Sequence, residues 1–251
     1  MKLSKIKHIH FIGAGGVGMI GIAEMLLNQG YKISGSDILE SKNTRRLKEK
    51  GVKVFMGHNT NNIKGADVIV YSSAVSDRNP EIVQAKKDNK IIIPRAEMLS
   101  SLMKKYQSIA VAGSHGKTTT TSMIANIFSD AELDPTYIVG GRIMGKEDSS
   151  ILGKSDYLIV EADESDGTFM HLNPEMSVLT NIDNDHLDFY DNNQTKLERT
   201  FYEFLEKIPF SGTAVICTDD IKAKKVFKKL SRQKISYGFK KGAIYQIGNL
   251  I

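Results

Sequence analysis

The sequence predicts an α/β protein built from two parallel-sheet domains, and two observations carry that prediction. Short apolar runs rich in β-branched residues alternate with helical patterns, an order typical of parallel sheets covered by helices on both faces. The alternation starts again near residue 107, and in both halves a glycine-rich loop follows the first apolar run. We therefore expect one domain over residues 1–106 and a second over residues 107–251.

The first half reads as five strands separated by helices. The expected strands are His8–Ile12, Tyr31–Gly35, Val52–Phe55, Val68–Tyr71 and Ile91–Ile93. The expected helices are Val17–Asn28, Thr44–Lys50, Glu81–Asp88 and a last one within Arg95–Tyr106. Because parallel strands need crossover connections of this kind, residues 1–106 are predicted to form a Rossmann-like parallel sheet.

The second half repeats the pattern. Its expected strands are Ser108–Ala112, Tyr137–Val139, Tyr157–Val160, Ser177–Thr180, Ala214–Cys217 and Lys234–Tyr237. Its expected helices are Ser122–Phe128, Gln194–Lys207 and Ile221–Leu230. No closing element follows a last strand-like run, Ala243–Ile247, so we expect this second α/β domain to be incomplete.

The composition favours a soluble cytoplasmic protein. Hydrophobic residues make up 41% and charged residues 25% of the chain, and no apolar run approaches the length of a membrane span. The N-terminus has no signal-peptide pattern, and the single cysteine excludes an internal disulfide. Much of the net charge of +5 comes from basic residues at 222–234 without interleaved aromatic residues, so we expect a solvated helix face and no nucleic-acid partner.

The strongest functional signal is the loop after the expected strand Ser108–Ala112. It contains Gly113, Ser114, His115, Gly116, Lys117, Thr118 and Thr119, which form a short G-x-x-G-K-T version of a phosphate loop. Glycines let backbone N–H groups point at phosphate oxygens, and the N-terminus of the following helix adds partial positive charge. We expect Lys117 to contact the β- and γ-phosphates of ATP, and Thr118 to place its hydroxyl on Mg²⁺.

A second glycine-rich loop, residues 13–18, follows the expected strand His8–Ile12. Its G-x-G-x-x-G pattern lets a pyrophosphate approach a helix N-terminus, and Asp37 stands where a ribose-binding acid belongs. Ser72 and Ser73 follow another strand and supply hydroxyls that bind sugar or phosphate oxygens or simply form a turn. Taken alone, the loop at residues 13–18 fits a NAD-dependent oxidoreductase or a structural turn. An enzyme that transfers a hydride does not need the phosphate loop at residues 113–118, which argues against the oxidoreductase.

Acidic residues follow two further expected strands. Glu161 comes first after Tyr157–Val160, where a Mg²⁺-holding carboxylate belongs beside a phosphate loop, and a solvated acidic loop is the alternative. Asn181 and His186 lie in a third segment, residues 180–188. Beside two aspartates, His186 could ligate a metal, position a phosphate or remain solvated.

Together these segments resemble the Mur ligases of bacterial peptidoglycan synthesis. The resemblance rests on residues 10–19, 35–37, 94–99, 113–120, 161–166 and 181–188, and it covers the chain in order. It implies that the first glycine loop binds a UDP-sugar instead of NAD. The residues that it implies for this site are Gly13, Ala14, Gly15, Gly16, Val17, Gly18, Ser36, Asp37, Ser72 and Ser73.

The resemblance also implies a reaction. ATP phosphorylates the carboxylate of UDP-N-acetylmuramate, and an amine then displaces phosphate to form an amide. Lys117, Glu161 and His186 are the implied catalytic residues, since positive charge stabilises the phosphoryl oxygens during transfer. Thr118, Glu161 and His186 are the implied Mg²⁺ ligands, and Asn181 joins the phosphate loop in binding ATP.

Within the family, the sequence is most similar to the branch that uses L-alanine as the amine. Several Mur ligases carry a carbamylated lysine on the helix after residues 181–188, and Thr200 stands at that place here, with Lys196 one turn earlier. A branch that attaches whole peptides is the alternative. Family members carry a third domain after the ATP-binding domain, so we expect this chain to bind both nucleotides, as a binding module would, without completing ligation. The sequence gives no oligomeric state.

Overall fold

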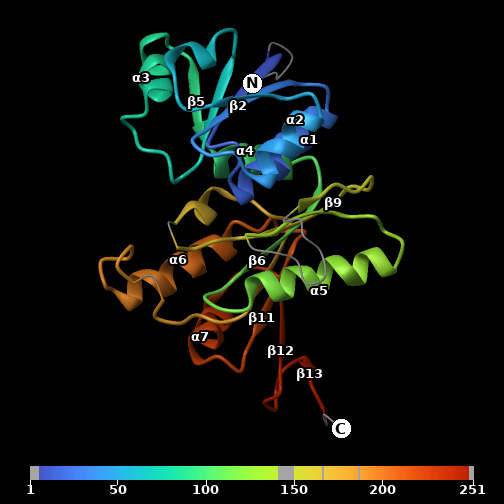
Figure 1. The fold of residues 1–251 in the computed structure, drawn as a ribbon. Helices are drawn as coiled ribbons and strands as arrows, with labels where there is room; N and C mark the ends of the chain where they lie inside the picture. Colours follow the sequence, from blue (N-terminus) through green and yellow to red (C-terminus); the bar gives the residue numbers. More distant parts are fainter. Residues whose placement is uncertain (1–5, 141–149, 166, 186, 249–251) are drawn as a thin grey trace. The chain divides into compact units, whose positions relative to one another are not determined.

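The structure is a computed structural model, which describes residues 6–140, 150–165, 167–185 and 187–248. The chain divides into two compact units, one made of Met1–Leu99 with Ser149–Leu152 and the other of Ser100–Asp148 with Gly153–Ile251. Figure 1 shows strands flanked by helices in each unit. The division falls after Leu99, whereas the sequence analysis places the domain boundary after residue 106.

Five parallel strands form the sheet of the first unit. They are β1 (His8–Ile12), β2 (Lys32–Asp37), β3 (Lys53–Met56), β4 (Val68–Tyr71) and β5 (Ile91–Pro94). Their order in the sheet is β3-β2-β1-β4-β5, and every pairing is parallel. The strand order therefore reverses beside β1, and open α/β sheets bind their ligands at such a point, outside the carboxyl ends of the strands.

Helices connect these strands, namely α1 (Val17–Asn28), α2 (Lys42–Glu49), the 3₁₀-helix η2 (Thr60–Ile63), α3 (Pro80–Lys87) and α4 (Arg95–Met103). Local chemistry sets several of their ends. Ser41 caps α2 by accepting a hydrogen bond from Thr44 N, and Asn79 caps α3 by accepting one from Glu81 N. Gly30, just past α1, has a φ of +86°, the left-handed conformation that favours glycine at helix C-termini.

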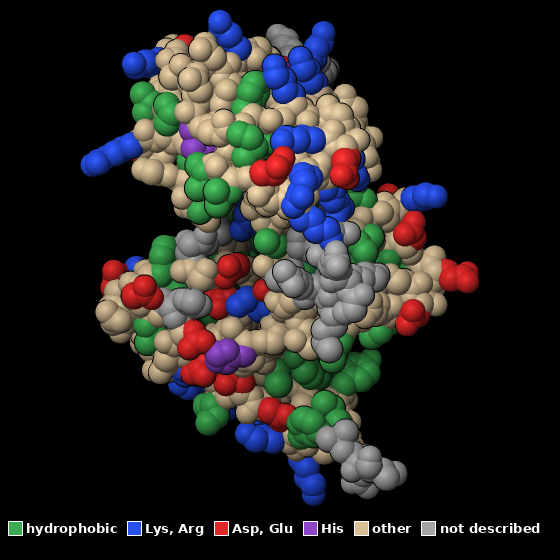
Figure 2. Space-filling model, in the orientation of Figure 1, with side chains coloured by type: hydrophobic (Ala, Val, Ile, Leu, Met, Phe, Trp, Pro, Cys, Tyr) green, Lys and Arg blue, Asp and Glu red, His purple; other side chains and the backbone are tan. Residues whose placement is uncertain are grey.

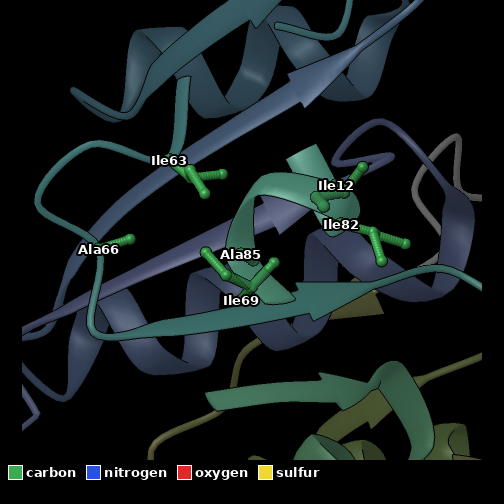
Figure 3. Packing of buried hydrophobic residues seen from close by; sticks show 6 residues of the cluster. All are labelled: Ile12, Ile63, Ala66, Ile69, Ile82 and Ala85. Atoms are coloured by element: carbon green, nitrogen blue, oxygen red, sulfur yellow. The ribbon is translucent and has the colours of Figure 1, made fainter. Parts of the chain in front are cut away.

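An apolar cluster packs the sheet of the first unit against α3 (Figure 3). It consists of Ile12, Ile63, Ala66, Ile69, Ile82 and Ala85, each at most 2% exposed. Full burial of one isoleucine side chain contributes about 1.5–3 kcal/mol. Because the cluster joins β1 and β4 to α3, it fixes the two strands whose carboxyl ends flank the point where the strand order reverses.

The sheet of the second unit has the phosphate-loop strand in its interior. Its strands are β6 (Gln107–Ala112), β7 (Thr136–Ile138), β9 (Tyr157–Glu161), β10 (Met176–Leu179), β11 (Thr213–Cys217), β12 (Lys234–Gly238) and β13 (Tyr245–Gln246). They run in the order β13-β12-β11-β10-β6-β9-β7 with parallel pairings. The two-residue strand β8 (Ser150–Ile151) falls within the first unit. Since β9 and β10 flank β6, the loops after these three strands meet at one edge of the sheet.

The second unit also contains α5 (Lys117–Asp130), the 3₁₀-helix η3 (Thr168–His171), α6 (Gln194–Glu206) and α7 (Ile221–Lys229). The sequence predicts the first of these helices only from Ser122, because β-branched threonines have low helix propensity. In the structure the helix begins at Lys117. The hydroxyls of Thr121 and Ser122 donate to the carbonyls of Lys117 and Thr118 at 2.8 Å, so these polar side chains bond within the helix.

The predicted α/β class is confirmed, with a parallel sheet in the first unit, and each expected strand overlaps an observed one. Most ends differ by one or two residues, which is the usual uncertainty of helix and strand boundaries. Among the described residues, three short elements have no counterpart in the sequence prediction, namely η2, β8 and η3. None of the described helices combines the length and the apolar character needed to span a bilayer.

Candidate nucleotide-binding sites

The first unit contains a cavity of about 680 Å³ where the strand order reverses beside β1. Its lining residues are Gly13, Gly15, Gly16, Asp37, Ile38, Leu39, Ser41, His58, Ser72, Ala74, Val75, Ser76, Arg78 and Asn79. The loops that follow β1, β2, β3 and β4 therefore line it. The volume lies in the range of about 300–1,000 Å³ that is typical of pockets for small ligands.

Hydrogen bonds hold the glycine loop of this cavity against the end of β2. Gly13 N and Ala14 N donate to Ser36 O at 2.9 and 3.0 Å, and Gly15 N donates to Asp37 Oδ2 at 2.8 Å. The loop leads into α1, whose N-cap is a glycine that has no side chain to cap the helix. The N-cap of α1 therefore places no side chain between the helix N-terminus and an anionic ligand, and Asp37 fixes the loop that leads to it.

The structure divides the residues predicted to bind a UDP-sugar into two groups. Those that line the cavity are Gly13, Gly15, Gly16, Asp37 and Ser72. Those that do not line it are Ala14, Val17, Gly18, Ser36 and Ser73. Gly18 instead packs against the side chain of Arg95. A Cβ at position 18 would overlap the Arg95 guanidinium.

A buried carboxylate lies behind the cavity. Glu81 is fully buried and accepts hydrogen bonds from Ser36 Oγ at 2.6 Å and Asn62 Nδ2 at 2.7 Å, while His10 Nε2 lies 3.1 Å from it. Burial opposes ionisation, but the hydrogen bonds from His10, Ser36 and Asn62 outweigh it and hold the pKa of Glu81 below its ordinary value. His58, which lines the cavity, has its Nδ1 3.5 Å from Glu81 Oε1, so this network reaches the cavity wall.

The phosphate loop lies at the carboxyl edge of the second sheet. It follows β6, whose two neighbours are β9 and β10. Glu161 is the last residue of β9, and Asn181 follows the end of β10 by two positions. The three separate segments that the sequence predicts to act together thus meet at one place because their strands are adjacent.

Residues after β10 hold the phosphate loop in shape. His115 N donates to Asn181 Oδ1 at 2.9 Å, and Asn181 Nδ2 donates back to His115 O at 3.0 Å. Thr180 Oγ1 donates to the same carbonyl at 2.7 Å. Gly113 has a φ of +135°, and a Cβ there would overlap Thr180 Oγ1, so only glycine suits this position. Asn181 therefore braces the loop with both ends of its amide.

Thr118 and Glu161, two of the predicted Mg²⁺ ligands, lie in contact. Thr118 Oγ1 lies 3.0 and 2.9 Å from the two carboxylate oxygens of Glu161, and Gly140 N donates to Oε2 at 2.7 Å. Mg²⁺ accepts oxygen ligands of this kind and commonly takes one or two of them from the protein, with the rest from water and phosphate. The pair therefore fits a Mg²⁺ shared with a nucleotide.

The structure brings no further predicted metal ligand to Thr118 and Glu161 among the described residues. His186, the third predicted ligand, lies outside the described residues. Across the part of the chain that the structure describes, no group of three or more His, Cys, Asp or Glu side chains gathers to hold an ion.

Lys117 forms an ion pair with a buried carboxylate to which the sequence analysis assigns no role. Its Nζ lies 2.8 Å from Glu164 Oε2 and donates to Glu164 Oε1 at 3.0 Å and to Ser114 O at 3.3 Å. The side chain of Glu164 is 0% exposed and that of Lys117 is 12% exposed. Burial raises the pKa of the Glu164 carboxyl, although Lys117 opposes that shift.

A histidine and acidic residues lie on the exposed side of the loop. His115 Nε2 lies 3.3 Å from Asp183 Oδ2 and 3.4 Å from Asp185 Oδ2, with all three side chains about half exposed. Hydrogen bonds from Asn184 N and His115 lower the pKa of Asp183. Figure 2 shows acidic and histidine side chains gathered on one face of the second unit. Exposed pairs of this kind contribute little to stability, so they are free to rearrange around a ligand.

Comparison with known proteins gives matches along nearly the whole chain. The model described as Mur ligase family, catalytic domain, matches residues 8–107, and the model of the Mur ligase middle domain matches residues 111–251. A UDP-N-acetylmuramate–L-alanine ligase of Methylobacillus flagellatus is 48% identical over 246 residues, which make up 98% of this chain and 52% of that protein. The chain thus spans about half the length of the curated relative it matches.

Solved structures agree with these matches. A UDP-N-acetylmuramate-alanine ligase from Thermotoga maritima is 30% identical with a TM-score of 0.81, over 94% of this chain and 53% of that one. A UDP-N-acetylmuramate:L-alanyl-gamma-D-glutamyl-meso-diaminopimelate ligase from Neisseria meningitides is 26% identical with a TM-score of 0.82, over 92% and 78% of the two chains. With both family models matched in order along the chain, this chain belongs to the Mur ligase family.

Proposed function

We propose that this chain supplies the UDP-sugar-binding and ATP-binding parts of an ATP-dependent ligase that joins L-alanine to UDP-N-acetylmuramate. The proposal rests on the convergence of Lys117, Thr118 and Glu161 at one sheet edge, in a chain 48% identical to an L-alanine ligase. In this proposal residues 1–106 bind the UDP-sugar and residues 107–251 bind ATP with Mg²⁺. The reaction would serve peptidoglycan synthesis in the cytoplasm.

The chemistry follows from the poor reactivity of a carboxylate. Transfer of the γ-phosphoryl group of ATP to the carboxylate of UDP-N-acetylmuramate gives an acyl phosphate, in which phosphate is a good leaving group. The amine of L-alanine then attacks the acyl carbon, and phosphate departs. Negative charge builds on the phosphoryl oxygens during the first transfer, and the ammonium of Lys117 with the N–H groups of the loop would stabilise it.

Thr118 and Glu161 would hold Mg²⁺ in this reaction, and His186 is proposed as a further ligand. When bound, Mg²⁺ supplies additional positive charge to the phosphate oxygens. Asn181 contributes by keeping the loop backbone in its phosphate-binding shape, since its amide bonds His115 on both N–H and C=O.

Titration of the chain with Mg·ATP by calorimetry tests the ATP site. Lys117→Ala removes a hydrogen bond from a charged group, which contributes about 1.5–3 kcal/mol, so the dissociation constant should rise by roughly 10- to 150-fold. Lys224→Ala is the matched control, because Lys224 is an exposed lysine on α7. Equal affinities for Lys117→Ala and the unaltered chain would contradict the assignment.

A separate thermal-shift measurement tests the ligand of the first unit. It compares the melting temperature of the protein with UDP-N-acetylmuramate and with NAD⁺. A ligand at about 100 times its dissociation constant stabilises a protein by about 2.7 kcal/mol. We expect stabilisation by the UDP-sugar, and stabilisation by NAD⁺ alone would favour an oxidoreductase.

A ligase that attaches whole peptides is the second candidate, favoured by the TM-score of 0.82 to the peptide-adding enzyme. The higher identity to an L-alanine ligase, 48% against 26% for the peptide-adding enzyme, ranks this candidate second. Mass spectrometry of the UDP-linked product, with L-alanine and a tripeptide offered together, separates the two candidates.

A further inference from the structure

Glu164 neutralises the lysine to which the proposed function assigns the phosphates of ATP. We infer that Glu164 is a built-in competitor for Lys117, so that a nucleotide polyphosphate binds only as Lys117 exchanges contacts with Glu164 for contacts with a phosphate oxygen. This inference rests on the proposed function, because it takes residues 113–119 as the ATP site.

The ammonium of Lys117 is already engaged in the structure. Of its three N–H donors, one donates to Glu164 Oε1 at 3.0 Å and another to Ser114 O at 3.3 Å, and Glu164 Oε2 lies 2.8 Å from the nitrogen. A phosphate oxygen that approaches this nitrogen also approaches a carboxylate of like charge. Since the Glu164 side chain is 0% exposed, water does not screen that repulsion.

Glu164 is the fixed partner of the pair. Its backbone carbonyl accepts hydrogen bonds from Tyr190 Oη at 2.7 Å and from Gly167 N at 3.1 Å, and Tyr190 is only 1% exposed. Lys117 carries its charge on a flexible four-carbon stem. The exchange is therefore a movement of the Lys117 ammonium toward the phosphate, with Glu164 staying in place.

The ion pair between Lys117 and Glu164 also explains how the mostly buried charge of Lys117 is tolerated when no nucleotide is bound. A buried charge without a partner is strongly unfavourable, and Glu164 compensates Lys117. Every polyphosphate that binds Lys117 must break the ion pair between Lys117 and Glu164, and this lowers its affinity. Removing the charge of Glu164 should accordingly tighten the binding of both ATP and ADP.

Glu164→Gln in the 251-residue chain tests this inference, because the amide keeps the shape of the side chain and removes its charge. Calorimetry with Mg·ATP and with Mg·ADP should show affinities about tenfold higher or more, which corresponds to about 1.4 kcal/mol. The matched control is Asp163→Asn, since Asp163 is an exposed carboxylate in the same segment whose Oδ1 accepts from Ser165 N at 3.1 Å. That control should change affinity by less than about twofold.

A double-mutant cycle separates competition for Lys117 from simple repulsion. In a Lys117→Ala background, Glu164→Gln should tighten binding less than in the unaltered chain, because the contested ammonium is gone and only the repulsion between the carboxylate and the phosphate is relieved. Equal tightening in both backgrounds would overturn the inference, and so would unchanged or weaker binding by Glu164→Gln alone. The latter result would mean that Glu164 positions Lys117 for the phosphate.

A crystal structure of the unaltered chain with Mg²⁺ and a non-hydrolysable ATP analogue gives a second measurement that does not depend on the variants folding. We expect Lys117 Nζ on a phosphate oxygen and beyond contact distance of the Glu164 carboxylate. An intact Lys117–Glu164 pair beside a bound nucleotide would overturn the inference and leave the proposed function standing. Failure of the unaltered chain to bind any nucleotide would overturn both.

Discussion

Glu81→Gln should strongly destabilise the first unit, because it changes charge and hydrogen-bonding capacity with almost no change in size. The Glu81 carboxylate is fully buried and accepts hydrogen bonds from Ser36 Oγ, Asn62 Nδ2 and Asn59 N at 2.6, 2.7 and 3.1 Å. The equally buried His10 places Nε2 3.1 Å from it. A glutamine brings one carbonyl oxygen and two N–H donors to a site that is arranged to offer donors.

The magnitude follows from how the two oxygens are shared. Oε2 serves Ser36 and His10, whereas Oε1 serves Asn59 N and Asn62 Nδ2. The amide oxygen must face the Asn59–Asn62 side, since neither of those groups can accept a hydrogen bond. The NH₂ group then meets Ser36 and His10, so two hydrogen bonds to a charged acceptor are lost. At about 1.5–3 kcal/mol each, the loss is about 3–6 kcal/mol, and rotation of the Ser36 hydroxyl moves it toward the lower end.

Hydrogen exchange of the β1 amides, followed against urea, measures this change within the first unit. Glu40→Gln is the matched control, because Glu40 is exposed and pairs with Lys48 on the surface at 2.8 Å, and this variant should show no measurable change. A loss below about 1 kcal/mol for Glu81→Gln at neutral pH would refute the reasoning, since it would mean that the network does not depend on the carboxylate.

The same variant should alter the acid limb of stability. Burial raises the pKa of Glu81, but its hydrogen bonds lower it more, so the folded-state pKa lies below the unfolded value of about 4.3. Stability from such a group is present above the unfolded pKa and is lost as the pH falls through the folded pKa. The difference between Glu81→Gln and the unaltered chain should therefore shrink below about pH 4. A difference that stays constant on acidification would contradict the lowered pKa.

Two further substitutions test the packing of each unit. Gly35→Ala should lower the melting temperature of the first unit, because its Cβ would lie 2.6 Å from the Cβ of Ala14, and overpacking of this kind costs about 1–3 kcal/mol. Phe201→Ala should destabilise the second unit by about 3–5 kcal/mol in urea unfolding, because Phe201 is 0% exposed and its ring centroid lies 5.4 Å from that of Phe169. Phe210→Ala, at a position 85% exposed, is the control and should leave the unfolding midpoint unchanged.

Local signals made much of the fold predictable from the sequence. Glycine loops, apolar runs and caps such as Asn79 act over a few residues, and they place β1, β4 and α3 within a residue or so of their observed bounds. The start of α5 at Lys117 was missed because threonine propensity argues against a helix there, whereas the phosphate loop and bonds within the helix favour one.

The buried charges could not be predicted in the same way, because their partners are distant in the chain. Glu164 stands 47 residues from Lys117, in an acidic run that also fits a solvated loop. Glu81 stands 71 residues from His10, and the sequence analysis assigned that histidine no partner. The sequence did not indicate that His58 lines the cavity of the first unit, and only the folded structure shows it there.

The site around Thr118 shows why strand register decides such contacts. Glu161 is paired with Val111 in the alignment of β9 on β6, and a slip of one residue would turn its side chain to the other face of the sheet, away from Thr118. The preceding residues of β9, 158–160, are all 0% exposed, so the strand is apolar on both faces and its pattern does not specify one register. Packing of the whole sheet must fix it. The sequence therefore predicts that Glu161 lies near the phosphate loop, but only the assembled sheet places its carboxylate on the Thr118 hydroxyl.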